Sequence, residues 1–132
     1  MSNLDDLLEE LNRNPGASAQ AIRAAAEALK AELPSDYVAF LRASNGGEGM
    51  IGETYLILWK AEELTEMNTS YQVSEYAPGL LLFGSDGGGE AFAFDTRTTP
   101  WPVVKVPFVG MELQYAEVLA PSFDAFLKTL AG

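Results

Sequence analysis

The sequence predicts an α+β domain in which an antiparallel or mixed sheet of about five strands packs against N-terminal helices and one C-terminal helix. Three observations lead to this prediction. Apolar residues recur at helical spacing in the first third of the chain, short β-branched and aromatic runs separated by turn residues fill the middle, and helical spacing returns near the C-terminus. Helices followed by a run of strands favour an α+β domain over a doubly wound parallel sheet.

The first third of the chain is expected to form three helices. Leucines at i, i+3, i+4 and i+7 predict a short helix that Asn14-Pro15-Gly16 ends: Leu4, Leu7, Leu8 and Leu11. The same spacing predicts a second helix behind the N-cap Ser18: Ile22, Ala25, Ala26 and Leu29. We expect this helix to end at Leu33, because Pro34 disfavours helical geometry in the residue before it and suits the first position of a third helix. That helix has a buried stripe and can be closed by Gly46 in a left-handed conformation: Tyr37, Phe40 and Leu41.

Strands are expected through the middle of the chain. Apolar, β-branched and aromatic runs predict strands at residues 55–59, 80–83, 91–94 and 103–106, and a less regular one at about residues 114–119. A fourth helix lies between the first two strands, with Glu62 and Glu63 near its positive end and a stripe of apolar residues: Leu64, Met67 and Tyr71. The final helix follows Pro121-Ser122 and again has helical spacing: Phe123, Phe126, Leu127 and Leu130.

The size of the chain fits one domain. It has 132 residues, of which 48% are hydrophobic, enough to fill a single core. It contains no repeat and no linker long enough to divide it. We therefore expect one domain over residues 1–132, with residues 1–32 as a leading helical extension.

The charge of the chain is strongly negative. Nineteen acidic residues against eight basic ones give a formal net charge of -11. This average field opposes binding to nucleic acid phosphates and favours a cationic partner. The alternative is that the acid surplus only keeps the protein in solution, and for an acidic domain chosen at random that is the better explanation.

Two residue types are missing from the chain. Without Cys and His there is no disulfide, no usual zinc ligand, and no Ser-His or Cys-His catalytic pair. We expect neither a metal nor a cofactor. The first residues are acidic rather than basic, and no apolar run approaches the roughly 18 residues that span a bilayer. We therefore expect a cytoplasmic protein with no membrane contact.

The glycine-rich loop at residues 84–90 invites two ligand hypotheses. Consecutive glycines can direct N–H groups at a phosphate, but the loop matches neither common phosphate-binding motif, and Asp86 and Glu90 would repel the anion. Calcium is disfavoured because the loop lacks the alternating oxygen ligands of an EF-hand. We favour a tight turn that joins two core strands.

Acidic residues near the glycines also raise the possibility of a hydrolase. Glycoside hydrolysis needs two carboxyl groups roughly 5 to 9.5 Å apart across a sugar-binding cleft. The candidates are the acids in and beside the loops at residues 47–53 and 84–90: Glu48, Glu53, Asp86, Glu90 and Asp95. Any acidic protein offers such pairs, and we favour solvated acids over a catalytic pair.

Aromatic residues supply a further set of candidates for a recognition surface: Trp59, Tyr71, Tyr76, Trp101 and Tyr115. Core packing is the favoured role for four of them. Trp101 lies between Pro100 and Pro102, which hold it in a rigid loop, and both a core role and a recognition role remain open for it.

Several of these segments, in this order and spacing, resemble the SUKH superfamily, which includes the Smi/Knr cell-wall assembly regulators and many bacterial immunity proteins. The resemblance covers residues from Leu33 to the C-terminus. It rests on nine segments: Leu33-Pro34, Tyr37, Phe40-Leu41, Asn45-Gly46-Gly47, Glu63-Leu64, Gly84 with Asp86 and Gly88-Gly89, Asp95, Ser122-Phe123 and Phe126-Leu127. Most of them also have a packing or turn role, so the resemblance supports a fold more strongly than an activity.

The resemblance implies a protein-binding domain without catalysis. Members of this kind are α+β domains, and many neutralise a cognate toxin, often a nuclease. A net charge of -11 fits a basic toxin as partner, whose nucleic-acid-binding surface an acidic inhibitor would cover. On this hypothesis the partner-binding residues are acids of the two loops and one tryptophan: Glu48, Glu53, Asp86, Glu90 and Trp101. The alternatives are a regulatory interaction module without a toxin and, last, an enzyme with an acid-only site.

Overall fold

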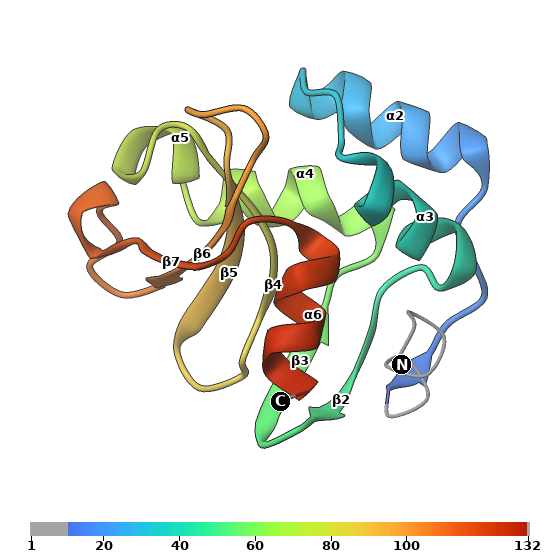
Figure 1. The fold of residues 1–132 in the computed structure, drawn as a ribbon. Helices are drawn as coiled ribbons and strands as arrows, with labels where there is room; N and C mark the ends of the chain where they lie inside the picture. Colours follow the sequence, from blue (N-terminus) through green and yellow to red (C-terminus); the bar gives the residue numbers. More distant parts are fainter. Residues whose placement is uncertain (1–10, 132) are drawn as a thin grey trace.

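The computed structural model describes residues 11–131, and an antiparallel sheet forms their centre. Seven strands are arranged in chain order, so each strand pairs with the ones before and after it (Figure 1). They are β1 (Asn12–Arg13), β2 (Gly47–Ile51), β3 (Thr54–Leu58), β4 (Leu80–Ser85), β5 (Glu90–Asp95), β6 (Val103–Pro107) and β7 (Glu117–Ala120). The predicted α+β class is confirmed, and the sheet is antiparallel rather than mixed.

Five helices pack around this sheet in the described part of the chain. They are α2 (Ala19–Leu29), α3 (Ser35–Ala43), α4 (Ala61–Ser70), α5 (Val73–Tyr76) and α6 (Phe123–Ala131). Helix α2 contacts α3 and α4, α3 contacts α6, and both α4 and α5 contact β4. Figure 1 shows α2 and α3 side by side at one end of the molecule, with α6 lying across the sheet. No described helix has the length and apolar character needed to cross a membrane.

One aromatic cluster joins α3, α6 and the central strands. Tyr37 lies 5.0 Å from Phe123 and 5.2 Å from Phe94 between ring centroids, and Phe83 lies 4.6 Å from Phe94. Side chains alternate along a strand, so Phe92 and Phe94 share one face of β5. Phe92 lies 4.9 Å from Phe126 of α6, and we call this face of the sheet the α6 face. The predicted stripes of the third and final helices are thus confirmed.

Helix α2 ends earlier than its sequence suggests. Ser18 caps its start as predicted, since its hydroxyl oxygen accepts a hydrogen bond from the N–H of Ala21. The predicted end at Leu33 is wrong. Lys30 adopts a left-handed conformation with φ of 55° just after Leu29, and residues 30–33 carry the chain to α3. Leu33 is instead a buried core residue ahead of Pro34, which takes the N-cap position of α3.

The first predicted helix lies mostly outside the described residues, which begin at Leu11. Leu11 is buried in the core. The next two residues form β1, in which Asn12 pairs with Glu48 and Arg13 with Gly47. The chain is therefore extended, not helical, before it reaches Asn14.

The secondary structure of residues 47–53 also differs from the prediction. We expected a loop, but Gly47–Ile51 is strand β2, paired along its whole length with β3. Gly52 and Glu53 make the tight turn between them, with φ of 59° at Gly52. A Cβ atom at Gly52 would lie 2.1 Å from the carbonyl oxygen of Leu130 in α6, so this position requires glycine for space as well as conformation.

The remaining strands agree with the prediction to within two residues, apart from the last. β4, β5 and β6 extend the predicted runs slightly. The predicted strand at residues 114–119 is shorter, because Leu113–Tyr115 forms a 3-10 turn and β7 begins only at Glu117. The connection at residues 96–102 is a turn-rich loop, as expected.

Candidate protein-interaction surface

Both tight hairpin turns lie at the same end of the sheet, which we call the hairpin end (Figure 1). One is the β2–β3 turn with Glu53, and the other is the β4–β5 loop at residues 86–89. The connection at residues 96–102, which contains Trp101, lies at the opposite end of the sheet. Strand β4 separates the two ends by about 16 Å, given the rise of roughly 3.3 Å per strand residue. The predicted partner-binding acids are therefore together at one end, and Trp101 lies apart from them.

Glu48 lies on the face of the sheet that is opposite to the α6 face. Glu48 of β2 pairs with Ile57 of β3, and Ile57 pairs in turn with Ser85 of β4, so these three residues form one row across the sheet. The carboxylate of Glu48 accepts a hydrogen bond from the hydroxyl of Tyr55. The pKa of Tyr55 is raised, chiefly by this hydrogen bond and then by desolvation and by the charge of Glu48. Gly87 lies against the Tyr55 ring, which brings the β4–β5 loop next to Glu48.

Asp86 holds the β4–β5 loop in shape from within. Its Oδ1 atom accepts hydrogen bonds from the N–H of Gly88 at 2.7 Å and of Glu90 at 3.1 Å. The Ser85 hydroxyl oxygen accepts another from the N–H of Gly87 at 2.8 Å. These N–H groups are therefore used inside the loop and do not point together at an anion. The tight turn that we favoured over a phosphate site agrees with this arrangement.

Glu90 points away from Glu48, although both lie at the hairpin end. Ala91 belongs to the same row as Ser85 and Glu48, so the alternation of side chains turns Glu90 toward the α6 face. Glu53 is exposed at the tip of the neighbouring hairpin. Glu48 and Glu90 thus lie on opposite faces of the sheet, which does not fit two carboxyl groups that face each other across one cleft, as a glycoside hydrolase requires.

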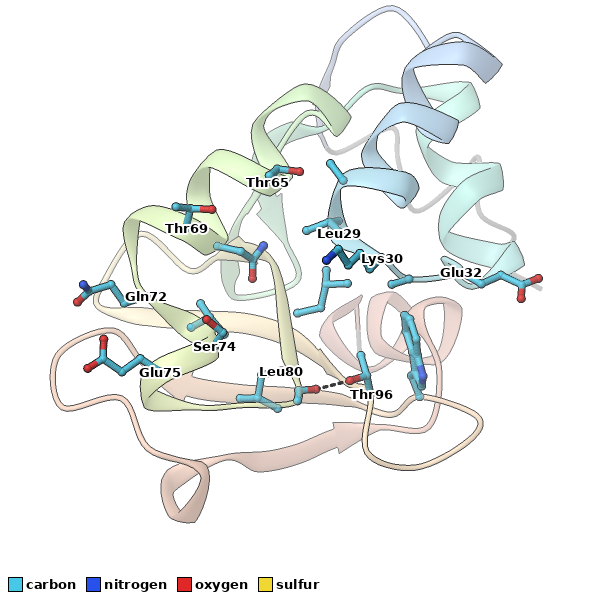
Figure 2. A pocket seen from close by; sticks show the side chains of 17 residues that line it. Leu29, Lys30, Glu32, Thr65, Thr69, Gln72, Ser74, Glu75, Leu80 and Thr96 are labelled. Atoms are coloured by element: carbon cyan, nitrogen blue, oxygen red, sulfur yellow. Dashed lines mark hydrogen bonds between the residues drawn. The ribbon is translucent and has the colours of Figure 1, made fainter.

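Trp101 borders a cleft of about 760 Å³ between the end of α2, helices α4 and α5, and the start of β4. Its ring is half-buried and lies 6.0 Å from Phe94 between centroids. Figure 2 shows Thr65 and Thr69 on one side of the cleft and Leu29 and Lys30 on the other. Trp101 thus contacts the core and is also partly exposed to the cleft.

Polar groups line much of this cleft. The Thr96 hydroxyl donates a hydrogen bond to the carbonyl of Gly79 at 2.6 Å (Figure 2). Asn68 of α4 lies beside Leu82, and its side-chain amide binds both main-chain polar groups of that residue. Asn68 has no sequence signal for this role beyond the poor helix propensity of asparagine in mid-helix.

The family model described as SMI1 / KNR4 family (SUKH-1) matches residues 16–129. This chain belongs to the SMI1 / KNR4 family. No curated protein is significantly similar to it. The match begins at Gly16, so the SUKH-1 region includes helix α2. This region therefore begins before Leu33, where the resemblance seen in the sequence begins.

The aromatic candidates of this SUKH-1 domain separate into three groups. Trp59 is buried, as expected for a core residue, and Trp101 borders the cleft. Tyr71, Tyr76 and Tyr115 are exposed, and they line a second hollow of about 580 Å³. A core role is therefore wrong for these three tyrosines.

The chain has nineteen acidic residues and eight basic ones, and few of the acids form ion pairs in its described part. Within residues 14–131 two ion pairs form, between Arg97 and Asp95 at 2.9 Å and between Lys105 and Glu117 at 3.6 Å. The first is a fork in which two guanidinium nitrogens bind the buried carboxylate, and its hydrogen bonds lower the pKa of Asp95. No three acidic side chains in this part of the chain are grouped so as to hold a metal ion.

Proposed function

We propose that this SUKH-1 domain is a non-catalytic immunity protein that neutralises a cognate basic toxin, such as a nuclease, by covering its functional surface. The observation that carries the proposal is the net charge of -11, together with the exposed acids Glu48 and Glu53 at one end of the sheet. A surface of one sign steers an oppositely charged partner during diffusion and aligns it before contact. A basic nucleic-acid-binding surface is the complementary target.

The contact is assigned to the hairpin end, with Trp101 at its margin. Glu48 and Glu53 are exposed there, and Asp86 and Glu90 are partly exposed beside them. A standard interface of about 800 Å² per partner is roughly 30 Å across, so one partner can reach from the acids to Trp101. Tight turns and paired strands hold the acids in place, which lowers the entropy that binding must remove.

The acids themselves favour binding over catalysis. The carboxylate of Glu48 is engaged by Tyr55, and Oδ1 of Asp86 is engaged by two N–H groups of its own loop. The sequence has no His or Cys to act as a general base or nucleophile at neutral pH. Inhibition by occlusion needs only complementary charge and shape.

A regulatory interaction module of the Smi/Knr type is the second candidate, and the cleft beside Trp101 favours it. A cleft of about 760 Å³ with both polar and apolar lining is suited to a peptide segment of a partner. Such a module would bind several partners weakly, whereas an immunity protein binds one partner very tightly.

The deciding experiment is recovery of the tagged protein from its own cells at low and at high salt, with mass spectrometry of what accompanies it. One stoichiometric basic partner that survives high salt, and whose toxicity the protein relieves on co-expression, is the expected result. Several partners lost at high salt would favour the regulatory module. A partner without toxicity would rule out the immunity role even if the complex were tight.

A further inference from the structure

The second hollow is lined chiefly by aromatic side chains from three segments. Its lining residues include Tyr71 after α4, Tyr76 at the end of α5, and four residues of the connection from β6 to β7: Phe108, Met111, Glu112 and Tyr115. We call these six residues the tyrosine pocket. The hollow has a volume of about 580 Å³, which admits a large side chain.

The rings of the tyrosine pocket are held in place but are not buried. Tyr71 and Phe108 lie 4.5 Å apart between centroids at an angle of 34°. The N–H of Phe108 donates a hydrogen bond to the carbonyl of Gly89 at 2.9 Å, which ties the pocket to the hairpin end. Tyr76 is 51% exposed and Tyr115 is 55% exposed. Exposed tyrosines beside one another are typical of binding hot spots, because they offer a large contact area with little rotamer entropy to lose.

Charge decides what fits between these rings. Glu112 is the one charged residue of the lining, and neither lysine nor arginine borders the hollow. The side-chain amide of Gln114 donates to the Glu112 carboxylate at 2.7 Å and holds it in position. Aromatic faces attract a cation, and arginine also stacks flat on a ring while its N–H groups bind a carboxylate. An apolar side chain would instead remove water from the Glu112 carboxylate and supply no hydrogen-bond donor or positive charge in its place.

We propose that the tyrosine pocket binds an arginine side chain of the basic partner protein. This inference rests on the proposed function, because it specifies how that partner is held next to the acids of the hairpin end. The arginine side chain lies between the exposed tyrosines, with its guanidinium near Glu112. Electrostatic steering brings the partner to this side of the molecule, and the pocket then fixes its register.

The test uses Nα-acetylarginine amide as the probe, followed by the aromatic NMR signals of the whole protein. Saturable shifts of the Tyr71, Tyr76, Phe108 and Tyr115 ring signals are expected. The neutral isostere Nα-acetylcitrulline amide should bind about tenfold more weakly, because it has the same shape without the charge. Glu112→Gln should weaken arginine binding at least about threefold. The matched control Glu66→Gln, an exposed acid on α4 outside the pocket, should leave it unchanged.

Three results would overturn the assignment. They are equal binding of the arginine and citrulline amides, undiminished binding by a Tyr76→Ala, Tyr115→Ala double variant, and tighter binding of Nα-acetylleucine amide. Both tyrosines are about half exposed, so their loss leaves the core intact. The titration needs no partner, so its failure is separate from failure of the proposed function, which the co-purification decides. If the probe binds but no toxin is found, only the immunity role is lost.

Discussion

The side-chain amide of Asn68 makes the two hydrogen bonds to Leu82 that a neighbouring strand would otherwise make. Its Nδ2 atom donates to the carbonyl of Leu82 at 3.0 Å, and the N–H of Leu82 donates to its Oδ1 atom at 2.9 Å. Strand β3 pairs with β4 only through Ile57 and Leu58, so Leu82 has no partner from β3. One residue of α4 thus satisfies the two main-chain groups that the sheet leaves open, and it attaches α4 to the edge of β4.

Removing this amide should destabilise the domain. Asn68→Ala leaves the buried N–H and carbonyl of Leu82 without partners, and each such group costs about 1–3 kcal/mol. We expect the free energy of unfolding to fall by about 2–4 kcal/mol in urea titrations. Thr69→Ala, at the next and exposed position of α4, is the control and should change it by less than about 0.5 kcal/mol. A variant as stable as the parent would contradict the role assigned to Asn68.

Tyr37 gives a prediction in the opposite direction. Its side chain is 1% exposed, and its hydroxyl has no hydrogen-bond partner within residues 11–131. Burial raises the pKa of this hydroxyl well above its usual range. Tyr37→Phe should therefore raise the free energy of unfolding by about 1 kcal/mol, since it removes an unsatisfied buried group and keeps the ring. Tyr76→Phe, at an exposed site, should have no effect. A loss of stability in Tyr37→Phe would mean that the hydroxyl does have a partner.

Asp124 predicts a pH dependence of stability. Its pKa is raised above the ordinary 3.8 by burial and then by the charge of Asp36, with Lys128 acting in the other direction. The folded state therefore holds this proton more tightly than the unfolded state, and stability falls as the pH rises from 3.8 through the folded pKa. The Asp124→Asn variant has no carboxyl group at this position, so this loss of stability does not occur in it. Its stability relative to the parent should thus increase from pH 3 to pH 6 in urea titrations.

The control for Asp124 is an uncharged exposed residue on the same helix. Thr129→Ala should differ from the parent by a constant amount over the same pH range, because it removes no titrating group. Constant offsets such as helix capping cancel in this comparison. A flat or falling difference for Asp124→Asn would show that its carboxyl group does not titrate as described.

Charge reversal tests where the partner binds. Glu48→Lys with Glu53→Lys should slow association with the partner about tenfold at low salt, because steering depends on the local field. The effect should shrink as salt screens the charges. Asp86 is left unchanged, because its carboxylate holds the β4–β5 loop. Stopped-flow association rates at several salt concentrations provide the measurement.

A second double variant separates local from overall charge in that experiment. Glu27→Lys with Glu66→Lys reverses two exposed acids on α2 and α4 and changes the net charge by the same amount. It should slow association less than the hairpin-end variant. Equal effects would mean that net charge alone guides the partner, and the assignment of the contact to the hairpin end would fail.

Much of the fold follows from local patterns. The stripe of Tyr37, Phe40 and Leu41 predicts a buried helix because helical spacing aligns these side chains on one face. The same reasoning places Phe123 and Phe126 in the core. Strand β2 was not predictable in this way, because Gly47 and Gly49 have low strand propensity and only the pairing with β3 makes them extended.

The candidate site was predictable in part. The acids of the hairpin end were named from their place beside glycines, and the structure brings them to one end of the sheet. The separation of Trp101 from them follows from the direction of β4. The tyrosine pocket combines Tyr71, Tyr76 and Tyr115, which are up to 44 positions apart, and no local spacing connects them.

By itself the sequence determined the α+β class, the helix stripes and the negative charge, because these depend on residue type and on spacing within one element. The tertiary structure alone decided that Asn68 completes the edge of β4, that Glu48 and Glu90 point to opposite faces, and that Tyr71 and Tyr76 line one hollow with Glu112 and Tyr115. Each of these depends on strand register and on the packing of elements far apart in the chain, which local spacing does not specify.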